Sequence, residues 1–405
     1  GRVIVVGIDG ADWRVIEPLA ARGRLPSFRR LVAGGASGVL MSMHPSASPS
    51  LWTTVATGVG PERHGIHGFV EETGGPRVRP VTSTMRQAPA FWNILPAYDR
   101  KVGVVGWLVT WPAEPTDGYI VSSYLPYLYN WSTGRPLKGT LVEGIPHQTF
   151  PAGLIDELEP LKVKPADVPA EAVRRFYDPA RVARLSRDDR ECVRGFLWSL
   201  ACDQTFGAIG LRLFERYPVD LFAVYFGGID VASHRFWKFA YPEALRYNAT
   251  PEEVAILGRV IEESYVAMDE RVGEYLERLT PADTLVVLSD HGFRPVLEPG
   301  RPTTSGHHRD EGILALYGAA ARRGHRIATA GLLDVLPTLL AILDVPIAMD
   351  LEGHVLEEAL DPAFLKAHPP RFVERYDTPG APALPDRSDL DANVLERLRS
   401  LGYID

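Results

Sequence analysis

Cysteine is scarce in this chain: its 405 residues include two, Cys192 and Cys202. Two cysteines cannot form a disulfide framework, and their spacing does not match the cysteine pairs of a zinc site. Because a free cysteine packs as a small apolar residue, we expect both to be buried in a helical segment. The small disulfide-stapled proteins are thus excluded as a class.

Long hydrophobic runs are also missing. The longest apolar stretch, residues 331–349, is interrupted by two aspartates and a threonine, so it falls short of the roughly 18 residues that a membrane helix needs. No signal peptide is recognisable, and the chain begins at Gly1 directly before an apolar run. We expect a soluble protein without an integral membrane segment, cytoplasmic or extracytoplasmic after loss of a leader.

Positive charge is in the minority. Lysine and arginine number 43 against 51 aspartates and glutamates, which gives a formal net charge of −8, and no run rich in basic residues occurs. A protein that binds nucleic acid through its phosphates needs a concentrated positive field. Nucleic acid is therefore not an expected partner, and the ordinary content of glycine and proline indicates a globular chain.

Five short apolar runs are spread along the chain at wide intervals. They are continuous rather than alternating, which is typical of strands buried on both faces of a sheet, and helical patterns lie between them. This alternation predicts an α/β fold with a mainly parallel sheet sandwiched by helices. We expect strands at residues 3–8, 102–107, 221–226, 284–288 and 313–317, and helices at residues 49–56, 251–279 and 332–343.

Two regions depart from the alternation. Residues 125–210 contain proline-punctuated loops and then a charged helical section, and we expect them to form a cap inserted into the core. Residues 358–405 are rich in proline and charge, which predicts an extended tail that ends in a short helix at residues 393–404. The core is then expected to consist of residues 1–124 and 211–357.

Metal-ligating residue types stand beside four of the five predicted strands. A single aspartate after a strand is often a turn former or a helix cap, and an Asp and His four residues apart are often a surface pair. Their convergence at the carboxyl edge of one sheet instead indicates a site for two metal ions, because carboxylate and imidazole suit Zn²⁺ or Mn²⁺. The candidates are Asp9, Asp230, His234, Asp290, His291 and, on a loop before the last strand, His307 or His308.

The segment around Ser48 and Pro49 has two interpretations. A helix could begin there with Ser48 as the N-cap and Pro49 in the first turn, ending near Gly58. The same position suits a nucleophile, because unpaired N–H groups and the positive end of the helix dipole favour a phosphate oxygen. A metal ion bound to Ser48 would lower the pKa of its hydroxyl.

Six motifs occur along the chain in a fixed order. They are Gly-Ile-Asp9-Gly; Ser-Pro-Ser-Leu-Trp-Thr-Thr-Val-Ala-Thr-Gly-Val-Gly-Pro-Glu-Arg-His64-Gly-Ile; Asp230-Val-Ala-Ser-His234-Arg-Phe-Trp; Ser-Asp290-His291-Gly-Phe; Gly-His-His308-Arg-Asp-Glu-Gly-Ile-Leu; and Asp334-Val-Leu-Pro-Thr-Leu-Leu. In order and spacing they resemble the alkaline phosphatase superfamily, specifically its type I phosphodiesterase and nucleotide pyrophosphatase branch. The resemblance extends from residue 3 to about residue 357, apart from the predicted cap.

The resemblance implies how the ligands divide between two divalent ions. His308 is favoured over His307 because it stands four residues before Gly312, as in the family pattern His-x-x-x-Gly-Ile, which leaves His307 as a neighbour or phosphate contact. One ion would be held by Asp230, His234 and His308, and the other by Asp9, Asp290 and His291.

The resemblance also implies a hydroxyl nucleophile between the two ions. The family's nucleophilic threonine often stands two residues before the proline, where this chain has Ala47. Counting back from Ala-Thr-Gly leads to Ser48 instead, with Ser46 and Ser50 as alternatives.

Two departures from the pattern bear on the activity. Nucleotide pyrophosphatases carry an asparagine where this chain has Phe69, and sulfatases need a Cys-x-Pro-x-Arg context that neither cysteine provides. We expect a hydrolase of a small phosphorylated substrate that uses two ions, Zn²⁺ or Mn²⁺, and a covalent phosphoseryl intermediate. A phosphodiester or phosphonate is the first choice of substrate and a phosphomonoester the second; a non-catalytic metal- or partner-binding module is the contrasting class.

Five further residues are candidates for substrate contact. Trp107 stands at the end of a predicted strand, where core packing is the favoured interpretation, and Arg309 directly follows a ligand and suits either a second phosphate or solvent. The candidates are His67, Phe69, Trp107, His307 and Arg309.

Overall fold

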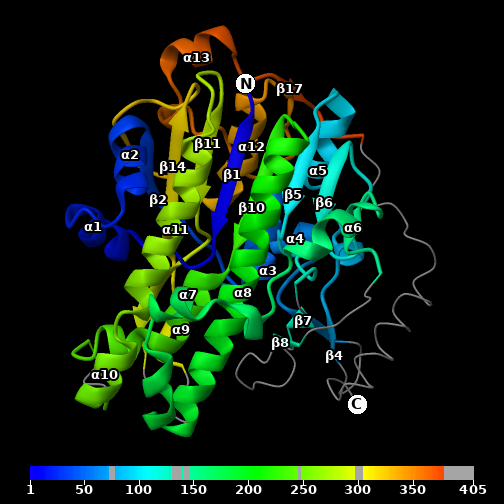
Figure 1. Cartoon of the computed structure of the whole chain (residues 1–405). Helices are drawn as coiled ribbons and strands as arrows, with labels where there is room; N and C mark the ends of the chain where they lie inside the picture. Colours follow the sequence, from blue (N-terminus) through cyan, green and yellow to red (C-terminus); the bar gives the residue numbers. More distant parts are fainter. Residues whose placement is uncertain are drawn as a thin grey trace.

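A nine-stranded sheet crosses the molecule in this computed structural model (Figure 1). The structure describes residues 1–72, 78–126, 128–129, 139–140, 146–244, 248–296 and 304–377. In spatial order the strands are β15 (His325–Ile327), β2 (Ala36–Met41), β14 (Glu311–Gly318), β11 (Thr284–Leu288), β1 (Val3–Ile8), β10 (Leu221–Phe226), β5 (Val102–Val105), β6 (Gly118–Val121) and β9 (Thr149–Phe150).

The centre of the sheet is parallel. Strand β1 pairs in parallel with both β10 and β11, and β5 continues the parallel run beside β10. Strand β14 is antiparallel to β11, so its first residues lie at the same edge where β1, β10 and β11 end. The prediction of a mostly parallel α/β sheet flanked by helices is confirmed, and the reversed strand brings the residues that precede it to the carboxyl edge.

Both faces of the sheet are covered. In β1, Val3 and Val5 belong to one core cluster, whereas Ile4, Val6 and Ile8 belong to the other. Burial on both sides explains why this strand is a continuous apolar run. One face packs against α1 (Trp13–Ala21), α2 (Pro26–Gly34), α8 (Arg187–Arg216), α9 (Gly228–Ala240) and α11 (Val260–Leu276), and the other against α3 (Ser48–Thr57), α5 (Phe91–Ile94) and α12 (Val335–Ile342).

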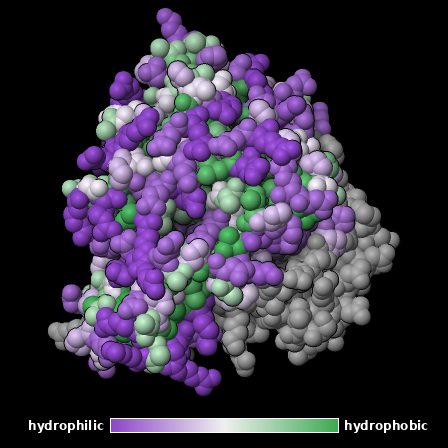
Figure 2. All heavy atoms as spheres, viewed as in Figure 1, coloured by the Kyte–Doolittle hydropathy of each residue, from purple (hydrophilic) through white to green (hydrophobic). Residues whose placement is uncertain are grey.

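The covering helices turn a polar side to solvent. Seen from the side of α8 and α11, the surface is mostly hydrophilic, and hydrophobic residues are visible between the hydrophilic ones (Figure 2). No helix in the described part of the chain combines the length and the apolar character that crossing a lipid bilayer requires.

The predicted helix at residues 251–279 is divided into α10 (Pro251–Leu257) and α11. Gly258 ends α10 at a close approach to α9, because a Cβ at this position would lie 3.0 Å from the carbonyl oxygen of Phe239. The helical periodicity of the sequence continues across this break, so the sequence pattern predicted one helix and not two. The helix expected at residues 332–343 begins with a 3₁₀ turn at Leu332–Asp334 and continues as α12.

The boundaries of the predicted cap and tail remain a proposal. Within residues 125–210, β9 adds an edge strand to the sheet, and α8 packs on the sheet and buries Cys192 and Cys202, as expected for these cysteines. The helix predicted at residues 393–404 lies outside the described residues. The remaining elements are α4 (Pro61–His64), α6 (Leu154–Leu158), α7 (Ala170–Arg174), α13 (Pro362–Ala367), β3 (Val70–Glu72), β4 (Val78–Pro80), β7 (Leu128–Tyr129), β8 (Gly139–Thr140), β12 (Gly292–Pro295), β13 (Gly306–Arg309), β16 (Ile347–Ala348) and β17 (Phe372–Val373).

Candidate metal centre and nucleophile

The three central strands end beside one another, and each is followed by acidic residues. The register pairs Ile8 of β1 with Phe226 of β10, and Gly7 with Leu288 of β11. Asp9 therefore emerges next to the start of α9, which carries Asp230 in its first turn. The turn after β11 brings Asp290 and His291 to the same place. The sheet thus gathers residues that are up to 282 positions apart.

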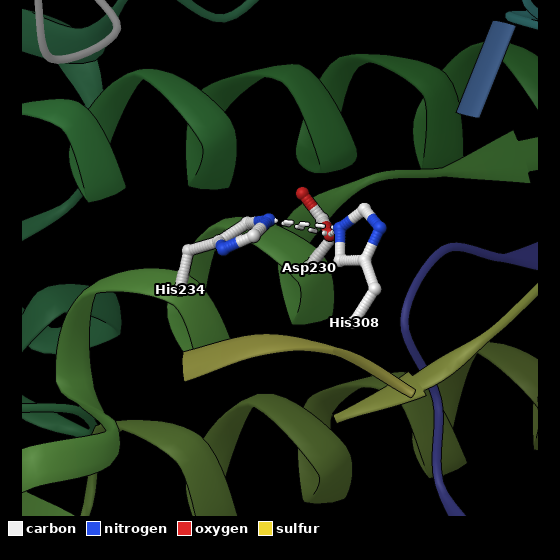
Figure 3. Close-up of side chains that lie close together, drawn as sticks. All are labelled: Asp230, His234 and His308. Atoms are coloured by element: carbon white, nitrogen blue, oxygen red, sulfur yellow. Dashed lines mark hydrogen bonds and ion pairs between the residues drawn. The ribbon is translucent and has the colours of Figure 1, made fainter. Parts of the chain in front are cut away.

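One group of ligand atoms is formed by Asp230 and His234 of α9 together with His308 of β13 (Figure 3). The spacing of four residues puts the first two side chains on one helix face. The Nε2 atoms of His234 and His308 each lie 3.4 Å from Asp230 Oδ1 and are 3.0 Å from each other. In Figure 3 both imidazoles converge on the same carboxylate oxygen.

His308 reaches this group on a strand and not on the expected loop. Strand β13 pairs antiparallel with β12, where His308 lies opposite Phe293. Hydrogen bonding between the two strands therefore holds the histidine in register with the segment that follows His291. Neighbouring residues of a strand alternate in direction, and the His307 ring centroid lies 6.5 Å from that of His234.

A second group consists of Asp9, Asp230 and His291, whose ligand atoms all lie within 4.8 Å of one another. His291 Nε2 lies 3.1 Å from Asp9 Oδ1 and 3.7 Å from Asp230 Oδ1. Asp290, which the sequence assigned to this group, lies beside it with Oδ2 3.7 Å from His291 Nε2. Asp230 thus belongs to both groups, and a single carboxylate lies between them.

All three imidazoles are oriented in the same way. Each Nδ1 atom lies within hydrogen-bond distance of a backbone carbonyl, and because a carbonyl only accepts, Nδ1 carries the proton. In the neutral ring that binds a metal, each Nε2 then carries the lone pair and is directed into the cluster, which is the usual orientation of a metal-ligating histidine. The pairs are His234 with Gly306 at 2.9 Å, His308 with Ser46 at 2.9 Å and His291 with Gly292 at 3.1 Å.

The unpaired polar atoms of the cluster fit divalent cations. Both carboxylate oxygens of Asp290, Oδ1 of Asp230 and Nε2 of His291 are buried and have no hydrogen-bond partner within the described residues. Buried polar atoms without partners are strongly unfavourable, and two imidazole lone pairs 3.0 Å apart repel each other. A cation with nitrogen and oxygen ligands would relieve both, and Zn²⁺ and Mn²⁺ accept such a donor set.

The electrostatics of the cluster also favour added positive charge. Burial and the neighbouring Asp9 raise the pKa of Asp290 well above its ordinary value. Burial alone would do the same to Asp230, but the adjacent His234 outweighs it and lowers the pKa of that carboxyl well below the usual range. Burial opposes protonation of His291, yet the carboxylates around it raise its pKa to about 10.

Ser48 is the first residue of α3 and does not cap the helix. The N-cap is Ala47, and no side-chain capping bond is made, so the predicted N-cap role of Ser48 is wrong by one position. Its Oγ instead lies 3.4 Å from Asp9 Oδ1 and donates toward it. The amides of Ser50 and Leu51 donate to the Ala47 carbonyl, so the helix start offers fewer free N–H groups than the sequence suggested.

Asp9 has two further partners that the sequence analysis missed. Tyr225 donates its hydroxyl to Asp9 Oδ2 at 2.5 Å, and the Trp52 indole N–H donates to the same oxygen at 3.2 Å. Tyr225 is the one polar side chain in the apolar run of β10, and Trp52 stands one helical turn after Ser48. Those positions are the sequence features from which both residues could have been found. Their hydrogen bonds to Oδ2 hold the Asp9 carboxylate so that its Oδ1 faces Ser48 and His291.

The sequence matches one protein family over most of its length. Residues 3–332 match the model of the family described as type I phosphodiesterase / nucleotide pyrophosphatase. The chain belongs to this family. The match confirms the resemblance drawn from the motifs, including membership of the alkaline phosphatase superfamily. No curated protein matches the chain.

Solved structures share the fold of this phosphodiesterase-family chain at low sequence identity. Murine ectonucleotide pyrophosphatase / phosphodiesterase 5, an inactive variant in complex with AMP, aligns with a TM-score of 0.53 at 12% identity over 89% of this chain and 100% of its own. The human enzyme gives 0.52 at 13% identity, with the same coverage. Phosphonoacetate hydrolase from Sinorhizobium meliloti 1021, with phosphonoformate, gives 0.45 at 17% identity over 74% of this chain; the chain spans 58% of its length.

Two residues of the ligand cluster line a pocket. Ser48 lines it together with Asp9 and Asp230, whereas Ser46 and Ser50 do not. Its other walls are mainly apolar, and no lysine or arginine occurs among the described lining residues. The apolar walls include Phe69, Val81, Leu108, Val109, Phe206 and Val231, and the polar ones include Ser123, Tyr124 and Asp203.

Of the five residues expected to contact substrate, Phe69 is the one that lines this pocket. His67 is exposed outside it. Trp107 is fully buried and donates its indole N–H to the Trp52 carbonyl at 3.1 Å. It therefore lies in the core, although its sequence neighbours Gly106 and Leu108 line the pocket. Arg309 is paired with Asp12 and does not face the pocket.

Proposed function

We propose that this protein is a two-metal-dependent hydrolase of phosphate esters, with phosphodiesters or phosphonates as preferred substrates and Ser48 as the nucleophile. One observation carries the proposal: buried carboxylate oxygens of Asp230 and Asp290 and Nε2 of His291 have no hydrogen-bond partner within the described residues and lie together, with the pocket-lining Ser48 hydroxyl beside Asp9. In a structural ion pair the polar atoms have hydrogen-bond partners, whereas both carboxylate oxygens of Asp290 and Nε2 of His291 have none within the described residues. Unsatisfied, charge-perturbed groups at the mouth of a pocket are the usual mark of a functional site.

Two groups of residues would hold the ions. Asp230, His234 and His308 form one ligand set, and Asp9 and His291 form the other, with Asp290 beside it and Asp230 between the two. Zn²⁺ fits this donor set best and Mn²⁺ is the alternative. When bound, the ions would polarise the phosphoryl group and lower the pKa of the Ser48 hydroxyl and of a hydrolytic water.

The residues of the chain would perform a two-step transfer. Ser48 Oγ forms a bond to phosphorus while the bond to the leaving alcohol breaks, which leaves a phosphoserine ester. Water then forms the new bond to phosphorus, and the Ser48 Oγ–P bond breaks to regenerate the hydroxyl. Tyr225 and Trp52 keep Asp9 in place throughout, so that its Oδ1 stays next to the nucleophile.

The charge of the pocket supports a diester over a monoester. Apart from the proposed ions, the described lining has no basic side chain to balance the second charge of a dianion, and Asp203 adds a further acidic group. A phosphodiester carries one negative charge, whereas a monoester carries up to two near neutral pH. The apolar walls around Phe69 and Phe206 suit an uncharged substituent. The murine fold relative was solved with AMP, which is a small phosphorylated molecule.

The proposal is tested by metal content and by turnover. We expect two Zn²⁺ per chain by elemental analysis after loading, and hydrolysis of bis(p-nitrophenyl) phosphate or p-nitrophenyl phenylphosphonate in preference to p-nitrophenyl phosphate and p-nitrophenyl sulfate. Ser48→Ala should abolish turnover, and mass spectrometry of quenched wild type should detect the transferred phosphoryl group on the Ser48 peptide. Ser50→Ala is the matched variant on the same helical turn.

Each arm can contradict the proposal. Fewer than two ions per chain would refute the metal centre. Full activity of Ser48→Ala, or loss of activity in Ser50→Ala alone, would refute the nucleophile assignment. A protein that binds two ions but hydrolyses none of the four esters would instead be a metal- or partner-binding module.

A further inference from the structure

We infer that Asp12 and Arg309 form a positioning pair that fixes the metal-ligating segments relative to one another; the inference rests on the proposed metal-dependent function. Arg309 Nη1 lies 2.9 Å from each carboxylate oxygen of Asp12. Asp12 is fully buried and the Arg309 side chain is 12% exposed. Asp12 stands three residues after Asp9, and Arg309 directly follows His308, so the pair joins two segments that each carry a ligand.

Asp12 joins a third ligand segment as well. Its Oδ2 accepts the backbone N–H of Phe293 at 3.0 Å, two residues after His291. Gly292 permits this approach, because a Cβ there would lie 2.6 Å from Asp12 Oδ2. One carboxylate therefore connects the turn after β1, the start of β12 and the end of β13, and these are the segments of Asp9, His291 and His308.

Other buried bonds hold Asp12 without help from Arg309. Its Oδ1 caps α1 by accepting the Arg14 N–H at 2.8 Å, and its own N–H donates to the Tyr265 hydroxyl at 3.0 Å. Ser289 Oγ accepts the Ala11 N–H at 2.8 Å and lies 2.9 Å from the His291 carbonyl, to which it donates. Removal of Arg309 should therefore leave the turn folded while β13 loses its side-chain link to that turn.

The contacts of Arg309 give it this role in place of the phosphate contact considered from the sequence. Nη1 is engaged by Asp12 and Nε donates to Glu311 at 2.9 Å. Glu311 lies at the more exposed side of the pair, with a side chain that is 38% exposed. Residues that orient metal ligands typically change metal affinity or activity 10- to 100-fold when they are replaced. We expect the contact with Asp12 to determine metal affinity, because Asp12 also connects the segments of Asp9 and His291.

The test measures Zn²⁺ affinity of the metal-free full chain by competition with a chelating dye, alongside circular dichroism and kcat and KM for a diester. Arg309→Met should lower Zn²⁺ affinity roughly 10- to 100-fold and reduce kcat with little change in KM. Arg309→Lys should have a Zn²⁺ affinity between those of wild type and Arg309→Met, because an ammonium group keeps the charge but lacks the planar pair of N–H donors of a guanidinium. Glu311→Gln, which removes the negative charge of the other partner of Arg309, is the matched control and should bind Zn²⁺ within about twofold of wild type.

The outcomes separate this inference from the proposed function. If wild type itself binds no Zn²⁺, the metal centre is refuted. If wild type binds and a natively folded Arg309→Met binds equally well, the positioning role is overturned. A raised KM with unchanged Zn²⁺ affinity also overturns it, because that result means a substrate contact. Should Arg309→Met not fold, Arg309→Lys decides: wild-type affinity in the folded lysine variant overturns the inference, and weakened affinity supports it.

Discussion

The two ends of the central strands use the same residue types for different purposes. At the amino edge, near the N-terminus in Figure 1, Asp283 is 2% exposed and both of its oxygens have partners. It accepts the Arg2 backbone N–H at 2.7 Å, the Arg2 guanidinium at 2.8 Å and the Thr280 N–H at 2.9 Å. At the carboxyl edge, beyond the other end of β11, Asp290 is fully buried and its oxygens have no hydrogen-bond partner within the described residues.

The pKa shifts at the two edges have opposite signs. Burial alone would raise the pKa of both aspartates, but the bonds from Arg2 and Thr280 lower the pKa of Asp283 well below its ordinary value. At Asp290, burial is reinforced by the neighbouring Asp9, so its pKa is raised well above the usual range. One edge of the sheet thus stabilises the fold, whereas the other holds unfavourable charges together, which is what the proposed metal site requires.

The largest predicted difference between the edges concerns activity. Asp230→Asn should reduce kcat more than 1,000-fold, roughly 4 kcal/mol of transition-state stabilisation, because Asp230 belongs to both groups of ligand atoms. Elemental analysis should show metal loss in the same variant. Asp283→Asn is the control at the opposite edge, and its kcat should stay within about twofold of wild type. Similar kcat values for both variants would remove the functional distinction.

The next difference concerns stabilisation by metal. Zn²⁺ at about 100 times its Kd should raise the free energy of unfolding of wild type by roughly 2.7 kcal/mol for each ion bound, since only the folded chain presents the sites. Asp283→Asn should keep this increment. Asp290→Asn should lose much of it, yet in the presence of a chelator it should be no less stable than wild type, because it removes a buried repulsive carboxylate. Denaturant unfolding with and without Zn²⁺ checks this; a chelated Asp290→Asn less stable than wild type contradicts it.

The smallest difference concerns stability and pH. Asp283→Asn should lower the free energy of unfolding by about 2 kcal/mol at pH 7, because it weakens hydrogen bonds to a buried charged group. Since the folded pKa of Asp283 is depressed, its contribution is present above the unfolded pKa of about 4 and is lost as pH falls through the folded value. The gap between variant and wild type should therefore shrink below pH 4, as measured by urea unfolding at pH 7 and pH 3. A gap that is independent of pH would refute this assignment.

Much of the core of the fold followed from apolar patterning. The runs predicted at residues 3–8, 221–226 and 284–288 are β1, β10 and β11 with the same bounds, because strands buried on both faces have a continuous signal. Strand β2, Ala-Ser-Gly-Val-Leu-Met, was missed since its residues alternate between buried and half-exposed. The direction of β14 was not predicted either, because pairing is a long-range property that local sequence does not carry.

The candidate site divides in the same way. Chemistry-bearing residue types at the ends of strands indicated Asp9, Asp230, His234, Asp290 and His291, and the structure brings them to one edge. The sequence did not predict that the helix cap moves to Ala47, which leaves the Ser48 hydroxyl to point at Asp9. Nor did it indicate that Arg309 turns to Asp12, because the two are 297 residues apart.

By itself the sequence determined the fold class, the family and the residues able to ligate metal, because these depend on local periodicity and on residue types in order. The tertiary structure decided which atoms meet. The antiparallel course of β14 and the pairing of β12 with β13 bring His308 to Asp230, and backbone carbonyls turn three imidazole Nε2 atoms inward. Those contacts join distant segments, and only packing of the whole chain determines their geometry.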